Sequence, residues 1–218
     1  MLAVEGGTFT MGCTNQQSDC VIDEKPAHQV SVSDYYIGKY EITQNQWILI
    51  MNKNPSSMKG NNLPVENVSW NEVQEFITKL NMKTGKTFRL PTEAEWEFAA
   101  KGGNHSKGND FSGSYSIEEV AWYKFNSDTN SHQVGQKKAN ELGIYDMTGN
   151  VCEWCSDWYG DYSSGDQNNP QGAPTGQDRV VRGGGWYFNP QNCRVSSRLN
   201  IRPKKTYNSI GFRLVLAP

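Results

Sequence analysis

Two helix-start signals constrain the fold of this chain more than any other feature of its sequence. Ser69-Trp70-Asn71-Glu72 is a capping box, in which the Ser69 hydroxyl and the Glu72 carboxylate each accept a backbone N–H at the start of a helix. Apolar side chains then follow at helical spacing: Val73, Phe76, Ile77 and Leu80. A second box, Thr92 to Glu95, precedes Trp96, Ala99 and Ala100. The sequence therefore predicts two helices that each bury one face.

The rest of the chain predicts short elements and long loops. It contains 21 Gly and 9 Pro, and from residue 102 to 178 its apolar groups are isolated among polar residues. Short strands are expected over 4–12, 28–40, 180–186 and 210–216, with a short helix from Thr43. With 7 Trp, 10 Tyr and 8 Phe the chain can build a core, and no repeat or linker divides it. We predict a single α+β domain over residues 1–218 that presents residues 187–209 as a surface segment.

Charge and hydropathy argue against a nucleic-acid partner and against a membrane span. The formal net charge is −2 and the basic residues are dispersed, which argues against a nucleic acid held by phosphate contacts. No stretch approaches the roughly 20 apolar residues of a membrane span. The first ten residues lack the basic head and apolar core of a secretory signal. We favour a cell-surface or secreted location, with any targeting segment lying outside this chain.

The five cysteines give no metal-binding pattern. Cys13 and Cys20 lie close enough in a polar loop to pair. Cys152 and Cys155 form a C-x-x-C, but zinc needs two further ligands, and no second such pair is present. We expect this pair to be small buried residues, and Cys193 is left over.

Seven motifs resemble those of the formylglycine-generating, or sulfatase-modifying factor, enzyme family, and they occur in the family's order. They are VEGGTFTMG, EKPAHQVSVSDYYIGKYEIT, LPVENVSWNEVQEF, FRLPTEAEWEFAAKGG, GIYDMTGNVCEWCSDWY, RVVRGGGW and GFRLV. The match runs from about residue 4 to residue 216. The resemblance implies a C-type-lectin-like fold, a mixed α/β body with little regular structure and long loops.

The resemblance also locates the family's copper site, and this sequence departs from it. Family members hold copper with two cysteines in the segment after their R-G-G-S motif, because soft thiolates suit Cu(I). Here Cys193 matches the second cysteine, Phe188 stands at the first, and Gly185 replaces the serine. A phenylalanine cannot bind copper, so we expect no copper and no catalytic residues. The alternative is an oxidoreductase of the formylglycine-generating class with an altered site that uses Cys193.

The resemblance implies one structural calcium site. The positions that match a calcium turn of the family are Asp146 and Glu153 through side chains, and Gly149 and Val151 through backbone carbonyls. The competing interpretation is a Gly-Asn turn with solvated carboxylates.

The C-terminal segment resembles the variable region of proteins diversified by retroelements, which also use a C-type-lectin-like fold. Its Tyr and Phe offer contact area at low entropic cost, while Asn and Ser adapt their hydrogen bonds. We predict a non-catalytic protein that binds a protein or glycan ligand; the remaining alternative is a structural component of a surface complex. The predicted ligand-binding residues are Trp186, Tyr187, Phe188, Asn189, Asn192, Ser197, Leu199, Asn200, Ile201, Tyr207, Asn208 and Ser209.

Several charged residues favour structural roles instead. Three glutamates sit on the second capped helix, where we expect them to cap it or to face solvent. Four arginines are expected to brace loops against carboxylates. These residues are Glu93, Glu95, Glu97, Arg182, Arg194, Arg198 and Arg213.

Overall fold

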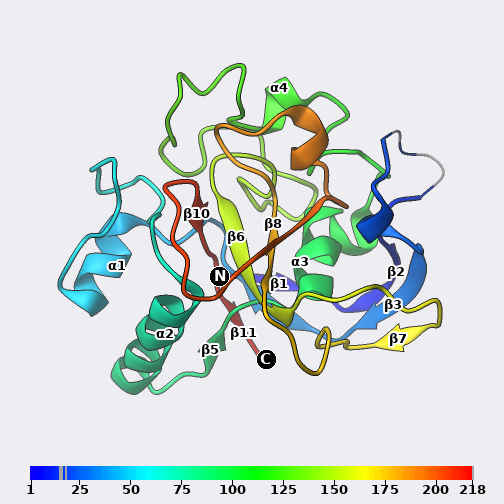
Figure 1. Ribbon diagram of the computed structural model, residues 1–218, viewed down its shortest axis with the longest axis horizontal. Helices are drawn as coiled ribbons and strands as arrows, with labels where there is room; N and C mark the ends of the chain where they lie inside the picture. The colour runs from blue at the N-terminus through cyan, green and yellow to red at the C-terminus, as the bar shows by residue number, and fades with distance from the viewer. Residues whose placement is uncertain (15–16, 18, 218) are drawn as a thin grey trace.

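Both predicted helices form where their capping boxes place them. α2 (Trp70–Thr84) begins after Ser69, and α3 (Glu93–Ala100) begins after Thr92; in each, both reciprocal hydrogen bonds of the box are present. The short helix expected after Thr43 is α1 (Gln44–Met51). A further helical turn, α4 (Ile117–Val120), was not predicted. The computed structural model describes residues 1–14, 17 and 19–217 (Figure 1).

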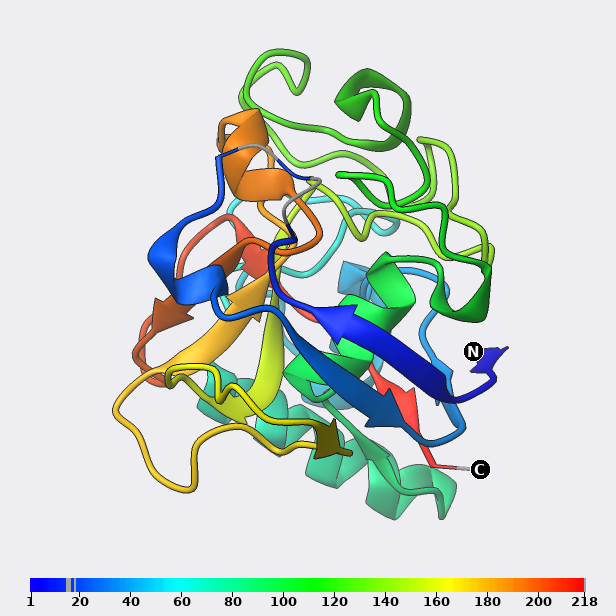
Figure 2. The same ribbon diagram turned by 90° about the vertical axis from the view of Figure 1, so that its right-hand side faces the viewer.

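The described strands form three small sheets, each assembled from distant parts of the chain. The first has the order β1 (Leu2–Val4), β4 (Tyr35–Ile37), β11 (Val215–Leu216), β5 (Phe88–Arg89) and is antiparallel throughout. It brings the two termini to one side of the molecule (Figure 2). The second has the order β10 (Ile210–Gly211), β6 (Cys152–Trp158), β8 (Arg179–Arg182), β9 (Arg198–Ile201). The third pairs β2 (Gly7–Met11) with β3 (His28–Val32), and β3 with β7 (Gln167–Asn168).

α3 lies at the centre of the molecule. It contacts β2 and β3 of the third sheet as well as β6 and β8 of the second, so every one of its residues is buried. α1 and α2 pack together in a separate part of the core, where Trp47 stacks on Phe76 with ring centroids 5.1 Å apart and Phe212 meets both rings edge-on. Short 3-10 turns complete the structure at Ile22–Glu24 (η1), Gly103–His105 (η2) and Pro190–Cys193 (η3).

The structure corrects the predicted strands in two ways. The expected strands over 4–12, 28–40 and 210–216 are each divided, because the chain changes sheet within them. The strand expected over 180–186 ends at Arg182, since Gly183 and Gly184 adopt φ angles of 93° and 67° that other residues avoid. Residues 187–209 are also not a continuous presented segment. Four of them form β9, which pairs with β8 from Arg198 to Ile201.

Candidate ligand-binding face

The chain leaves the second sheet through a close contact that only glycine permits. A Cβ on Gly184 would lie 2.4 Å from Cys193 Sγ and 2.8 Å from the Asn192 carbonyl oxygen. The chain can therefore fold directly over η3 before it reaches Trp186.

Trp186 is held by three hydrogen bonds from three parts of the chain. Its backbone N–H donates to the Asn150 carbonyl at 2.8 Å, and its own carbonyl accepts from Ser127 Oγ at 2.7 Å. Its indole Nε1 donates to the Asn208 carbonyl at 3.1 Å, which joins the two ends of the C-terminal segment. The loops around Trp186 are therefore braced rather than independent.

Aromatic side chains surround this point. Tyr187 packs edge-on against Trp186 with centroids 5.3 Å apart, and it lies 4.3 Å from the ring of Phe188. Tyr187 and Tyr207 are each 46% exposed, so both leave apolar ring surface in contact with water. We call Trp186, Tyr187, Tyr207 and Asn208 the aromatic face.

The other predicted ligand-binding residues have mixed positions. Asn189 is exposed just before η3, and Asn192 within it is half-buried. In β9, Leu199 and Ile201 pack against the core, while Asn200 donates to Asp178 Oδ2 at 2.8 Å. Ser197 and Ser209 are buried, so neither reaches the surface of the folded protein.

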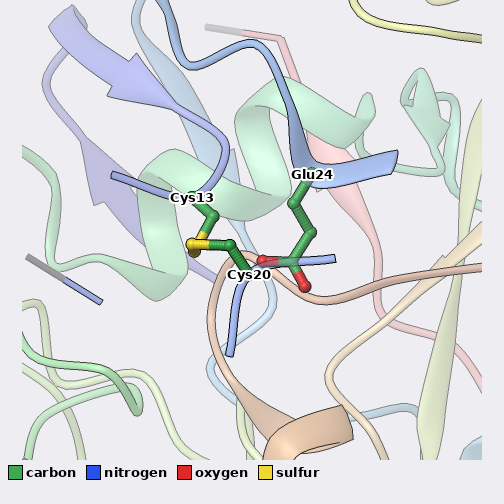
Figure 3. Close-up of side chains that lie close together, drawn as sticks. All are labelled: Cys13, Cys20 and Glu24. Atoms are coloured by element: carbon green, nitrogen blue, oxygen red, sulfur yellow. A yellow bond between two sulfur atoms is a disulfide. The ribbon is translucent and has the colours of Figure 1, made fainter. Parts of the chain in front are cut away.

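Cys13 and Cys20, which the sequence places close enough to pair, form a disulfide (Figure 3). Glu24 lies beside it, and these three residues are the one cluster of acidic, cysteine or histidine side chains within the described part of the chain whose ligand atoms converge. Both sulfur atoms form the disulfide. The Glu24 carboxylate accepts hydrogen bonds from Arg194 Nη2 at 2.5 Å and from Nη1 at 2.8 Å. The cluster is therefore a structural clasp rather than a metal site.

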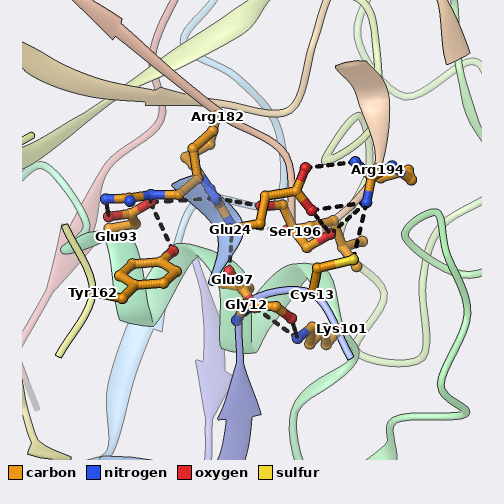
Figure 4. Close-up of polar contacts among 12 residues, drawn as sticks. Gly12, Cys13, Glu24, Glu93, Glu97, Lys101, Tyr162, Arg182, Arg194 and Ser196 are labelled. Atoms are coloured by element: carbon orange, nitrogen blue, oxygen red, sulfur yellow. Dashed lines mark hydrogen bonds and ion pairs between the residues drawn. The ribbon is translucent and has the colours of Figure 1, made fainter. Parts of the chain in front are cut away.

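The four arginines pair with buried carboxylates, as predicted. Figure 4 shows two of them, Arg182 and Arg194. Arg182, which has no exposed surface, pairs with Glu97 at 2.5 Å and Glu93 at 3.3 Å. Arg198 grips Glu93 with two nitrogens at 2.6 and 2.8 Å. These contacts tie α3 to β8 and to the segment that follows η3.

Of the three glutamates of α3, only Glu95 has one of the two predicted roles. Glu95 caps the helix through the Thr92 N–H and also pairs with Arg89. Glu93 and Glu97 do not face solvent; both are buried, because they supply the carboxylates for the arginines. Glu24, the partner of Arg194, could not be found from the sequence, because no local pattern links residues 170 positions apart.

Over residues 1–218 the chain matches the family described as Sulfatase-modifying factor enzyme 1-like domain. The chain belongs to this family. The family predicted from the seven motifs is thus confirmed.

Relatives within the family carry different names. The chain is 36% identical over 246 aligned positions to Chaperone protein LppX of Paenibacillus barcinonensis, covering 90% of this chain and 81% of the relative. It is 34% identical over 169 positions to the formylglycine-generating enzyme of Streptomyces coelicolor, covering 70% and 52%. It also spans 37% of the serine/threonine-protein kinase pkn1 of Chlamydia pneumoniae, at 30% identity over 98% of this chain.

Solved structures confirm the mixed α/β fold. Treponema denticola variable protein 1 superposes with a TM-score of 0.91 at 33% identity, covering 100% of this chain and 95% of that one. The U1 variant of the Major Tropism Determinant has a TM-score of 0.51 at 16% identity, covering 84% and 50%, a likeness that shows the fold alone. Within the described residues, no helix is both long and apolar enough to cross a membrane.

The copper position of the family is filled by packed side chains in this member. Phe188 is half-buried and contacts both the α1–α2 core and the cluster around Cys193. Cys193 has no exposed surface, and burial raises the pKa of its thiol to about 12. A buried, protonated thiol is a poor nucleophile. With Phe188 in place of the first cysteine the two-cysteine site is incomplete, and the absence of copper stays a prediction of the sequence.

In the turn that matches the family's calcium turn, the Glu153 carboxylate binds an arginine. Glu153 Oε1 and Oε2 accept from Arg213 Nη2 and Nε, each at 2.6 Å, and Oε2 also accepts from Trp96 Nε1 at 2.8 Å. Asp146 Oδ2 accepts from the Gly135 N–H at 2.7 Å. A dication on Glu153 would lie beside the guanidinium and be repelled by it. As folded, Glu153 is therefore committed to Arg213, and calcium binding by Asp146, Gly149, Val151 and Glu153 stays a prediction of the sequence.

Proposed function

We propose that this chain is a non-catalytic binding protein that recognises a protein ligand through the aromatic face. The observation that carries the proposal is the pair of half-exposed tyrosines, Tyr187 and Tyr207, on loops joined by the bond from Trp186 to Asn208. Rigid aromatic side chains on a braced surface lose little entropy when they bind, and such residues dominate binding energy at interfaces.

The chemistry and the relatives support binding over catalysis. Phe188 and the buried Cys193 remove the thiolate pair that copper chemistry in this family requires. The likeness to Treponema denticola variable protein 1 covers the whole chain and favours a binding role. The name of LppX, a chaperone, favours a protein ligand over a glycan.

Burial limits which positions could vary if a retroelement diversifies residues 187–209. Variation within 187–209 is tolerable where a side chain is exposed, as at Tyr187, Asn189, Asn200, Tyr207 and Asn208. It is costly at Ser197 and Ser209, which are buried. Diversification by a retroelement would be supported by a reverse-transcriptase gene in the flanking DNA beside a near-identical template repeat. It would be contradicted if the template differed from this gene mainly at the codons of the two buried serines.

The binding proposal is tested by panning a displayed random-peptide library against the folded protein. Peptides selected on the wild type should lose at least about tenfold in affinity for the Tyr187→Ala/Tyr207→Ala double variant, since each aromatic anchor contributes 1 kcal/mol or more. Tyr115→Ala, which removes a tyrosine that is 67% exposed elsewhere, is the matched control and should bind normally. Unchanged affinity in the double variant would contradict the proposal. So would copper-dependent oxygen consumption with a cysteine-containing sulfatase peptide.

A further inference from the structure

A cavity of about 200 Å³ opens beside the aromatic face. Trp186 and Asn208 form one side of it, and the loops that carry Ser57, Glu66, Thr129 and Ser131 form the rest. Its wall therefore combines an indole, hydroxyl groups and one carboxylate, and no lysine or arginine of the described chain lines it.

Glu66 is the unusual member of this wall. The residue is 1% exposed, and its Oε1 accepts from the backbone N–H groups of Ser57 and Met58. Its Oε2 is buried and has no hydrogen-bond partner among the described residues. A buried carboxylate oxygen without a donor costs free energy, and native proteins keep few of them.

Nearby basic groups do not fill this role. Lys59 lies close enough to influence Glu66, but its Nζ donates to the carbonyls of Asn54 at 2.9 Å and Ser56 at 2.5 Å. The Ser56 hydroxyl bonds to the Glu66 backbone instead of its carboxylate. No described side chain near Glu66 donates to this oxygen, and the cavity that Glu66 lines is the open space from which a donor of a ligand would approach the carboxylate.

The geometry points to a primary ammonium group as that donor, and we infer that the cavity binds a lysine side chain of the protein ligand. A cation suits a wall with one carboxylate and no basic residue, and an ammonium is also attracted to an indole such as that of Trp186. Only one carboxylate oxygen is free, which suits a point charge better than the two-pronged guanidinium of arginine. This inference rests on the proposed function, because it names one group of the ligand.

The test is a titration of the whole folded chain, followed by ¹⁵N–¹H NMR. The probe is lysine acetylated on its α-amine and methylamidated on its carboxyl; norleucine with the same caps is the matched probe without charge. We expect lysine to shift the backbone amides of Ser57 and Met58 and the Trp186 indole N–H, saturating with a Kd of about 1 mM, while norleucine shifts none.

A variant then assigns the effect to Glu66. In Glu66→Gln the amide oxygen can keep the bonds to Ser57 and Met58, while a neutral amide replaces the free oxygen, so lysine affinity should fall at least about tenfold with the melting temperature retained. Glu75→Gln, on the exposed face of α2, is the control and should not change the affinity.

Three results would overturn the inference. The first is equal shifts from lysine and norleucine, or none from either, in the wild type; this comparison holds even if Glu66→Gln fails to fold. The second is equal lysine affinity in wild type and Glu66→Gln. The third is saturation of the same resonances by methyl glucoside, which would assign the cavity to a sugar. Any of these, with peptide binding still lost in Tyr187→Ala/Tyr207→Ala, would remove the lysine site and leave the proposed function standing.

Discussion

At the scale of single residues, Glu153 occupies a position that matches a calcium-binding motif of the family, but its carboxylate binds other side chains of the protein. Its motif matches a calcium turn, whereas its two oxygens accept three hydrogen bonds from Arg213 and Trp96. Arg213 and Glu153 are both wholly buried, and a buried ion pair is stable only when its remaining polar atoms are bonded. Arg213 meets this condition, because it also donates to the carbonyls of Gly38 and Tyr145.

This pairing predicts that calcium contributes nothing to stability. Because Arg213 already neutralises Glu153, 1 mM calcium and a matched excess of EGTA should give melting temperatures within about 1 °C of each other; a ligand present at 100 times its Kd would add about 2.7 kcal/mol. Differential scanning fluorimetry measures the two conditions, with magnesium as the control cation. A calcium-specific rise of several degrees would show that the turn binds the ion as the sequence predicts.

At the scale of elements, α3 is short but central, and its first turn depends on one hydroxyl. Thr92 Oγ1 accepts the Glu95 N–H at 3.1 Å, and Thr92 is 3% exposed, so water cannot replace the cap. Thr92→Ala should therefore lower the free energy of unfolding by about 1 to 2 kcal/mol. Urea unfolding measures the change.

Thr78→Ala is the matched control for the cap. Thr78 lies on the exposed face of α2, and its hydroxyl bonds only to the Gln74 carbonyl one turn earlier. Its replacement should change the free energy of unfolding by less than about 0.5 kcal/mol. If Thr92→Ala and Thr78→Ala lower the free energy of unfolding equally, the buried cap stabilises the protein no more than an exposed hydroxyl does.

The elements also explain which parts of the structure the sequence can predict. A capping box lies within four residues, so α2 and α3 could be located from local pattern alone. β9 could not, because its pairing with β8 depends on a turn at Gly183 and Gly184 that the sequence does not place in space. The same limit applies to Glu66, whose unpaired oxygen becomes visible only when its loop meets Trp186 and Asn208.

At the scale of the whole molecule, buried acidic groups link stability to pH. Burial, together with the nearby Glu93 carboxylate, raises the pKa of Asp157 from 3.8 to about 7. Burial likewise raises the pKa of Asp146 to about 6. In the folded protein these two groups keep protons that the unfolded chain releases, so their contribution to stability falls as pH rises from about 4 to 7.

Replacing Asp157 by asparagine should remove the larger part of this loss. The asparagine oxygen can still accept from the Glu93 N–H, which now bonds to Asp157 Oδ2 at 3.0 Å, but the side chain no longer has to ionise in a buried site. Relative to wild type, Asp157→Asn should gain about 3 kcal/mol in free energy of unfolding between pH 5 and pH 8, as 1.36 kcal/mol per pKa unit implies. Urea unfolding at the two pH values measures the gain, and Asp166→Asn, at an exposed position, should show none. If the difference between Asp157→Asn and wild type is the same at pH 5 and pH 8, Asp157 does not titrate with folding, and the fall in stability must come from other buried carboxylates, such as Asp146.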